Sequence, residues 1–284
     1  MERTPPFQDM PSIWGLQLLH YLLIADVIEK AHLGDREAAL AGLEAAFRLS
    51  ASLAVRPELA SQFGVMRLAR LDLRVARALR PTTQAWCARV TAHSYRKSLL
   101  SGLQYEAWAI SHYARTETLI VYLNGPIDRP STLFGRWVMG PLASPYVRLC
   151  VANYSRILAE AVRDVQTENP CTFDAKAHDA GLADSVPEWN VVGGLAADGT
   201  IRGIGQSWAS AGRVDLDAEL TATLLEIEAA GKGGPWPPNV PPIISAVCPG
   251  LVWTYAVDAD GTMSVTPSIT PRSDGLPVAV MATR

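Results

Sequence analysis

The spacing of apolar residues from Trp14 to about Asn124 predicts a succession of α-helices. Apolar positions recur three and four residues apart, which places them on one face of a helix. The most apolar run, Ile13–Ile28, is interrupted by Gln17, His20 and an aspartate, and it is too short to cross a bilayer. We therefore expect this run to form a buried helix.

Glycine, aspartate and proline set the predicted helix boundaries in this region. Gly34 is expected to end the first helix in a left-handed conformation, and Asp35 to cap the second, over 36–53. Pro57 suits the first turn of a third helix. The remaining predicted helices cover 58–80, 83–94 with Thr83 as the cap, and about 98–123, where Asn124-Gly-Pro ends the last one.

Glycine and proline become frequent after this helical region. Residues 127–145 predict a long loop, after which Pro145 opens a helix to Val165. From Glu168 onward the pattern predicts loops and weak strands. One further helix is predicted at 215–230, capped by Asp215 or Asp217, and a connector with polyproline character follows it.

Two short β patterns near the C-terminus lie on either side of Asp258-Ala-Asp-Gly261. This turn sequence predicts a type I turn followed by glycine in the left-handed region, a common hairpin connection. Trp253, Tyr255 and Val257 point to one face and the residues between them to the other, so one face of the hairpin can pack on helices while the proline-rich connector covers the other. We expect the hairpin to cap the helical part of the protein.

Together these elements predict a mainly α-helical protein. The expected architecture is an antiparallel helical bundle or short solenoid with an irregular C-terminal section that ends in a β-hairpin. The predicted organisation is a helical body, 1–167, with a C-terminal section, 168–284, packed on it. One phrase, Gly34-Asp-x-x-x-Ala-Leu, resembles a tetratricopeptide unit but does not recur at a 34-residue period, so a regular array is not predicted.

The four cysteines divide into two pairs by local sequence. Cys87 and Cys150 lie in apolar helical patterns and are expected to be buried thiols. Cys171 and Cys248 lie in turn-rich segments and are the candidates for a disulfide. Such a bond would require α-carbons within about 7 Å and an oxidising compartment. It would tie the hairpin to the chain leaving the helical body.

The composition and charge of the chain limit the classes of partner that we expect it to bind. Hydrophobic residues make up 49% of the chain, the net charge is −3 and the pI is near 6.0, so neither nucleic acid nor an anionic membrane is an expected partner. The first residues lack the features of a signal peptide. The protein is therefore expected to be extracytoplasmic, in the periplasm or at the cell surface, if an export segment was removed, and cytoplasmic otherwise. Membrane anchoring would need a segment absent from this chain.

The candidates for catalysis are few. Ser207 lies in a degenerate nucleophile elbow, Gly-x-Ser-x-Ala, but all five histidines precede it, against the order in α/β-hydrolases. Glu106 and His112 share a predicted helix, although their spacing of six positions points them to different sides. No metal-ligand spacing and no cofactor motif is present, so neither a metal nor a cofactor is expected.

Four arginines at 3-4-3 spacing form a basic stripe on the third predicted helix, and they are the candidate partner-binding residues. The stripe could recognise phosphate or an acidic partner, but nearby acidic residues favour a solvated, partly paired face. Its members are Arg67, Arg70, Arg74 and Arg77.

Several stretches of the chain are similar to a group of bacterial proteins. They are GDREAALAGLEAAFRLSASLAVRPELASQ, the Trp86 helix, LDAELTATLLEIEAA and WP…CPGLVWTY…DGTMSV. The group consists of uncharacterised, helix-rich cell-envelope proteins of Acidobacteria and Planctomycete type. Such proteins usually begin with a membrane anchor or signal and have no established activity, so the resemblance supplies no catalytic residues.

Two functions follow as hypotheses. The first is a non-catalytic helical protein of the bacterial cell envelope that binds a protein partner or assembles with itself; it rests on the helical organisation and the absence of a coherent catalytic set. The alternative is a hydrolase whose site lies between the helical body and the C-terminal section and involves Ser207 or His112. The first is favoured.

Overall fold

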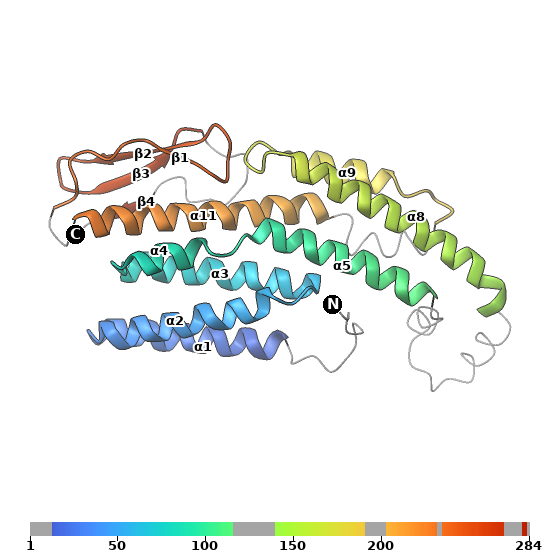
Figure 1. The fold of residues 1–284 in the computed structure, drawn as a ribbon, viewed down its shortest axis with the longest axis horizontal. Coiled ribbons are helices and arrows are strands. Elements are labelled where there is room, and N and C mark those ends of the chain that lie inside the picture. Colours follow the sequence, from blue (N-terminus) through green and yellow to red (C-terminus); the bar gives the residue numbers. More distant parts are fainter. Residues whose placement is uncertain (1–12, 116–139, 191–202, 232–234, 270–279, 283–284) are drawn as a thin grey trace. The chain divides into compact units, whose positions relative to one another are not determined.

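A computed structural model describes residues 13–115, 140–190, 203–231, 235–269 and 280–282, and within them the protein is mainly α-helical, as predicted (Figure 1). The helices are α1 (Ile13–His32), α2 (Arg36–Ala54), α3 (Leu59–Leu79), α4 (Gln84–Thr91), α5 (Tyr95–Arg115), α8 (Gly140–Thr167), α9 (Ala175–Asp184) and α11 (Ile204–Gly231). The strands are β1 (Ile243–Ile244), β2 (Val252–Val257), β3 (Met263–Pro267) and β4 (Val280–Ala282).

The described residues form two compact units. The first contains α1–α4, residues 169–173, most of α11 and the sheet. The second contains most of α5, α8 and α9, together with the first turn of α11. The predicted sections 1–167 and 168–284 each contribute to both units, and the division into a helical body and a section packed on it stays a prediction.

The junction between α1 and α2 has the predicted local structure. Gly34 has φ +80°, a conformation that glycine adopts without steric cost. The Asp35 side chain accepts a hydrogen bond from the backbone N–H of Ala38 over 3.1 Å, which caps α2. Thr83 occupies the corresponding position before α4, but its side chain makes no capping hydrogen bond, so that part of the prediction was wrong.

Two predicted helix starts were also wrong. The helix expected from Pro145 begins at Gly140 and contains Pro145, so the end of the predicted loop is helical and the rest lies outside the described residues. The helix expected from Asp215 begins at Ile204. The carboxylate of Asp179, on α9, accepts hydrogen bonds from the N–H groups of Gly205 and Gln206, which satisfies donors that the local sequence leaves unpaired.

Asp215 caps a different helix from the one expected. Its carboxylate accepts hydrogen bonds from the backbone N–H of Tyr95 at the start of α5, over 2.7 Å, and from Arg96 Nε over 2.9 Å. Asp217, two residues further along α11, pairs with Arg77 of α3 at 2.6 Å. Both aspartates are buried and carry partners, as burial of a charged group requires. They therefore fix α3 and the start of α5 against α11.

The predicted hairpin is the centre of an antiparallel sheet with the order β1-β2-β3-β4. Tyr255 pairs with Val265 in the β2–β3 register, and Gly261 closes the turn at φ +81°, as expected for this sequence. Strands β1 and β4 were not predicted, because a two-residue and a three-residue strand carry too little alternation to be recognised.

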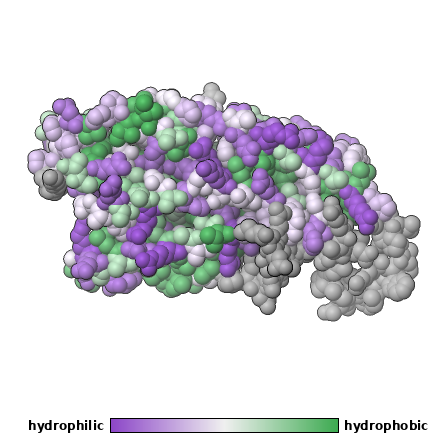
Figure 2. Space-filling view, in the orientation of Figure 1, coloured by the Kyte–Doolittle hydropathy of each residue, from purple (hydrophilic) through white to green (hydrophobic). Residues whose placement is uncertain are grey.

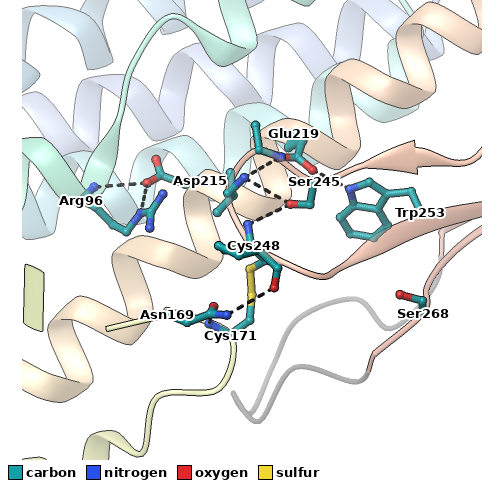
Figure 3. Close-up of a disulfide and its surroundings, with 12 residues drawn as sticks. Arg96, Asn169, Cys171, Asp215, Glu219, Ser245, Cys248, Trp253 and Ser268 are labelled. Carbon is teal, nitrogen blue, oxygen red and sulfur yellow. Dashed lines mark hydrogen bonds and ion pairs between the residues drawn. A yellow bond between two sulfur atoms is a disulfide. The ribbon is translucent and has the colours of Figure 1, made fainter. Parts of the chain in front are cut away.

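One face of the sheet packs on α11. Trp253, Met263 and Val265 share a buried cluster with leucines of that helix. Figure 3 shows that the Glu219 carboxylate, on α11, also binds this region: it accepts hydrogen bonds from the indole of Trp253 at 2.7 Å and from the backbone N–H groups of Ala246 and Val247. The buried apolar cluster and the Glu219 carboxylate thus both hold the sheet on α11.

The structure pairs Cys171 with Cys248 in a disulfide, as predicted (Figure 3). The two α-carbons are 5.9 Å apart, within the range that the bond requires. Close by, the side-chain amide of Asn169 donates a hydrogen bond to the carbonyl of Pro249 over 3.4 Å. Cys87 and Cys150 are free and buried, as their apolar surroundings indicated.

Candidate functional site

Helix α1 buries two polar side chains beside Ile24 and Val27 and exposes several large apolar ones. Its buried positions include the polar residues Gln17 and His20, with exposed fractions of 8% and 0%. Its exposed positions include Trp14, Leu18 and Leu22, at 75%, 62% and 61%. The prediction of a buried helix was therefore wrong for one face, which presents large apolar side chains to solvent. Figure 2 shows hydrophobic surface along the lower edge of the view, where α1 runs.

A buried polar contact fixes the inner face of α1 to its neighbours. His20 Nε2 lies 2.8 Å from Asp72 Oδ1 on α3, and the other Asp72 oxygen accepts a hydrogen bond from the Ser50 hydroxyl on α2 over 2.9 Å. Burial raises the pKa of Asp72, while the contacts with His20 and Ser50 oppose that shift. One carboxylate thus links α1, α2 and α3.

Close approach between helices provides a second constraint on α1. A Cβ atom built on Gly42 of α2 would lie 2.7 Å from Cγ2 of Val27, a side chain with an exposed fraction of 0%. Only glycine at this position lets the two helices come this near. Polar contacts and tight packing therefore hold α1 on its inner face. The rotation of the helix is fixed by these contacts, and so is the set of residues that it exposes.

The exposed residues of α1 form a regular seam. Trp14, Leu18, Tyr21, Ala25 and Ile28 are spaced 4-3-4-3, and all five are exposed. This spacing averages 3.5 residues and is that of the a and d positions in a coiled coil, where the apolar seam packs against a second helix. We call these five residues the α1 seam. Leu22 extends it on one side.

The charged residues of α1 add little net charge beside the α1 seam. The Lys30 ammonium donates a hydrogen bond to Asp26 at 2.6 Å, and this contact raises the pKa of Lys30. Glu29 is the remaining carboxylate near this end of the helix. A surface with this composition favours an apolar partner over a strongly charged one.

The predicted arginine stripe is divided in the structure. Arg70 donates a hydrogen bond to Ser210 over 3.1 Å, and Arg77 is paired with Asp217, so both face α11. Arg67 and Arg74 are exposed. The four arginines therefore do not form one continuous face on the surface, and their role in binding a partner stays a prediction.

The predicted catalytic candidates lie in the second unit. Ser207 is partly buried in the first turns of α11, within a helix that begins at Ile204, so no strand directly precedes it among the described residues. His112 is exposed on α5 and stacks on Trp108, with ring centroids 5.3 Å apart. Burial raises the pKa of Glu106 on the same helix. The hydrolase alternative, which would use Ser207 or His112, stays a prediction.

No protein-family model matches this chain, and neither the curated proteins nor the solved structures contain a match to it. The suggested relationship to cell-envelope proteins thus stays a prediction. Within the described part of the chain, no helix has the length and apolar content to cross a membrane, and no group of three or more metal-binding side chains is present.

Proposed function

We propose that this protein is a non-catalytic helical interaction protein that assembles with a second copy of itself through the α1 seam. The observation that carries the proposal is an apolar a/d seam on the exposed face of a helix whose buried face is partly polar. Exposing large apolar side chains to water is unfavourable for an isolated chain, and a covering partner removes that cost.

The size of the apolar surface supports a specific interface. Six of the exposed large hydrophobic residues belong to α1: Trp14, Leu18, Leu19, Tyr21, Leu22 and Ile28. With roughly 200 Å² for each fully exposed large side chain, they expose on the order of 600–700 Å², close to the roughly 800 Å² that each partner contributes to a standard interface. The other exposed large hydrophobics in the described residues are spread over several elements.

The chemistry of the seam favours a second copy as the occupant. A two-fold dimer applies the same surface to both partners, so that surface has to be self-complementary. The α1 seam meets this condition because it is uncharged and because a 4-3-4-3 pattern fits an identical pattern. Ala25 allows close approach of the partner helix. A membrane surface is less suited, since amphipathic helices that bind membranes carry lysine and arginine beside their apolar face.

The disulfide supports an extracytoplasmic location for this assembly. Disulfides persist in oxidising compartments and are rare in the reducing cytosol. The Cys171–Cys248 bond therefore favours the proposed cell-envelope setting.

The oligomeric state in solution tests the proposal. Sedimentation velocity of the disulfide-intact protein should show a concentration-dependent dimer. Leu18→Glu places a charge at the interface of both copies and should weaken dimerisation at least roughly tenfold. Leu33→Glu is the matched control, because Leu33 is 77% exposed but lies beyond the end of α1, and it should leave dimerisation unchanged.

Crosslinking gives a second measurement. Tyr21 is at the centre of the α1 seam, so Tyr21→Cys should form a crosslink between copies with a short bis-maleimide, while the buried Cys87 and Cys150 react slowly. A protein that stays monomeric up to about 100 µM would overturn the proposal. So would binding to lipid vesicles that is lost in Leu18→Glu, since it would identify a membrane as the occupant.

A further inference from the structure

The first unit contains an open cavity of about 400 Å³ on a surface distinct from the α1 seam. It lies among α2, α3 and the junction between α4 and α5. Phe47, Ala51 and Ala54 of α2 and Val65 of α3 supply apolar walls. The volume is within the roughly 300–1,000 Å³ typical of sites for small molecules.

The cavity has a polar floor. Asp72 and Ser50 line it; the Ser50 hydroxyl donates a hydrogen bond to Asp72, which also contacts His20. Tyr95 also lines it. Burial, together with Asp72 and Asp215, raises the pKa of Tyr95 above its ordinary value, which keeps the hydroxyl protonated. The floor therefore offers neutral hydrogen-bonding groups beside a carboxylate that is already occupied.

Two arginines supply positive charge at the cavity. Arg48 and Arg89 both line it, and both bind the same carboxylate, Glu44, at 2.6 and 3.1 Å. The group formed by Glu44 and the two arginines therefore has one net positive charge. Arg89 also stacks on Trp86, 4.9 Å from the ring centroid, which restricts its orientation.

The remaining titratable side chain does not supply this charge. Burial lowers the pKa of His93, which favours the neutral imidazole, and Asp215 only partly opposes this shift. His93 Nε2 lies 2.9 Å from the Ser98 hydroxyl. The arginines are therefore the groups in the lining that would attract an anion.

We propose that this cavity binds a small aromatic carboxylate, with its ring against Phe47 and the alanines of α2 and its carboxylate on Arg89 and Arg48. The ring matches the apolar walls, and a carboxylate matches the planar donor geometry of a guanidinium group. This binding activity is independent of the proposed dimer and uses a different face of the protein.

Fluorescence titration with 2-naphthoate tests the proposal, with 2-naphthylmethanol as the neutral analogue of similar shape. The naphthoate should bind at least roughly tenfold more tightly than the alcohol, because only the carboxylate gains a charge-assisted hydrogen bond. Arg89→Gln should reduce naphthoate affinity to that of the alcohol. Arg74→Gln is the matched control, because Arg74 is exposed on α3 and does not line the cavity.

Filling the cavity provides a second test. Ala51 lines it and is exposed, so Ala51→Trp should abolish binding of both naphthalenes without overpacking the core. Ser52→Trp, at the next position of α2 but outside the lining, should bind as the starting protein does. Circular dichroism verifies folding of each variant. Equal affinity for naphthoate and alcohol, binding that survives both Arg89→Gln and Ala51→Trp, or no binding at millimolar naphthoate would each overturn the proposal.

Discussion

At the scale of single residues, three buried aspartates make contacts with other helices that the sequence did not predict. Asp72 links three helices, Asp215 caps α5, and Asp179 caps α11. Each acts on residues that are distant in the sequence, so the short-range rules that identified Asp35 as a cap could not find them. A local cap can be predicted from four consecutive residues, whereas a cap supplied by another helix depends on the tertiary structure.

The protonation of Asp72 should be visible in the pH dependence of stability. Its pKa is raised above the ordinary 3.8, so the folded state binds the proton more tightly than the unfolded state does. The free energy of unfolding should then fall as the pH rises from about 4 through the raised pKa. Asp72→Asn lacks this titration, and its stability should change less across that window when measured by urea denaturation.

The groups that face Asp72 set the control for this experiment. His20 contacts it from α1, and Tyr95 lines the same cavity from α5. Measuring the effect of Asp72→Asn in a His20→Gln background separates the contribution of the Asp72 carboxyl group from that of its contact with His20. Two free energies of unfolding are compared, one with and one without Asp72→Asn. If their difference is constant from about pH 3.5 to about pH 7, Asp72 is not the source of the pH dependence.

At the scale of elements, prediction succeeded where strong signals were local. The bounds of α2 and α3 agree with the sequence to within one residue, because Gly34, Asp35 and Pro57 mark them. The starts of α8 and α11 were missed, since proline and glycine near them indicated loops. The α1 seam was missed for a different reason. Its large apolar residues lie on both faces of the helix and two of its four buried residues are polar, so the sequence pattern does not show which face is buried.

The two kinds of helix cap should differ in their contribution to stability. Asp35→Ala removes an exposed, local cap and should cost about 1 kcal/mol. Asp215→Ala removes the cap of α5 and also removes the ion pair between Asp215 and Arg96, a side chain that is only 23% exposed. It should cost more, roughly 2–3 kcal/mol after allowance for that exposure. Chemical denaturation of both variants measures the difference, and a smaller cost for Asp215→Ala would argue against a supporting role for this network.

At the scale of the whole molecule, apolar packing, hydrogen bonds and a disulfide together hold the sheet on the helices of the first unit. A hairpin alone is marginally stable, but this one shares a buried cluster with α11, binds Glu219 and is joined by a disulfide. The general architecture followed from the sequence because helix periodicity extends over most of the chain. The compact units did not, because they are built from segments that are far apart in the sequence.

Reduction of the disulfide should loosen the sheet first. The bond joins residues 77 positions apart and restricts the unfolded chain by up to roughly 4 kcal/mol in the chain-entropy model. Hydrogen exchange measured by mass spectrometry should therefore accelerate more in β2 and β3 than in α2 after reduction. Replacing the free Cys87 with Ala is the control for nonspecific thiol effects. Equal acceleration in all three elements would show that the bond stabilises the fold as a whole.

The same bond changes what a break in the backbone does to the molecule. Cys171 and Cys248 close a covalent ring that contains α9, α11 and β1. If a protease hydrolyses one peptide bond inside the ring, the two new chain ends separate, but both fragments stay joined through sulfur. Their local concentration remains high, so they can stay folded together after the cut. The nicked protein would keep its full mass on a non-reducing gel and divide into two fragments only when a thiol is added.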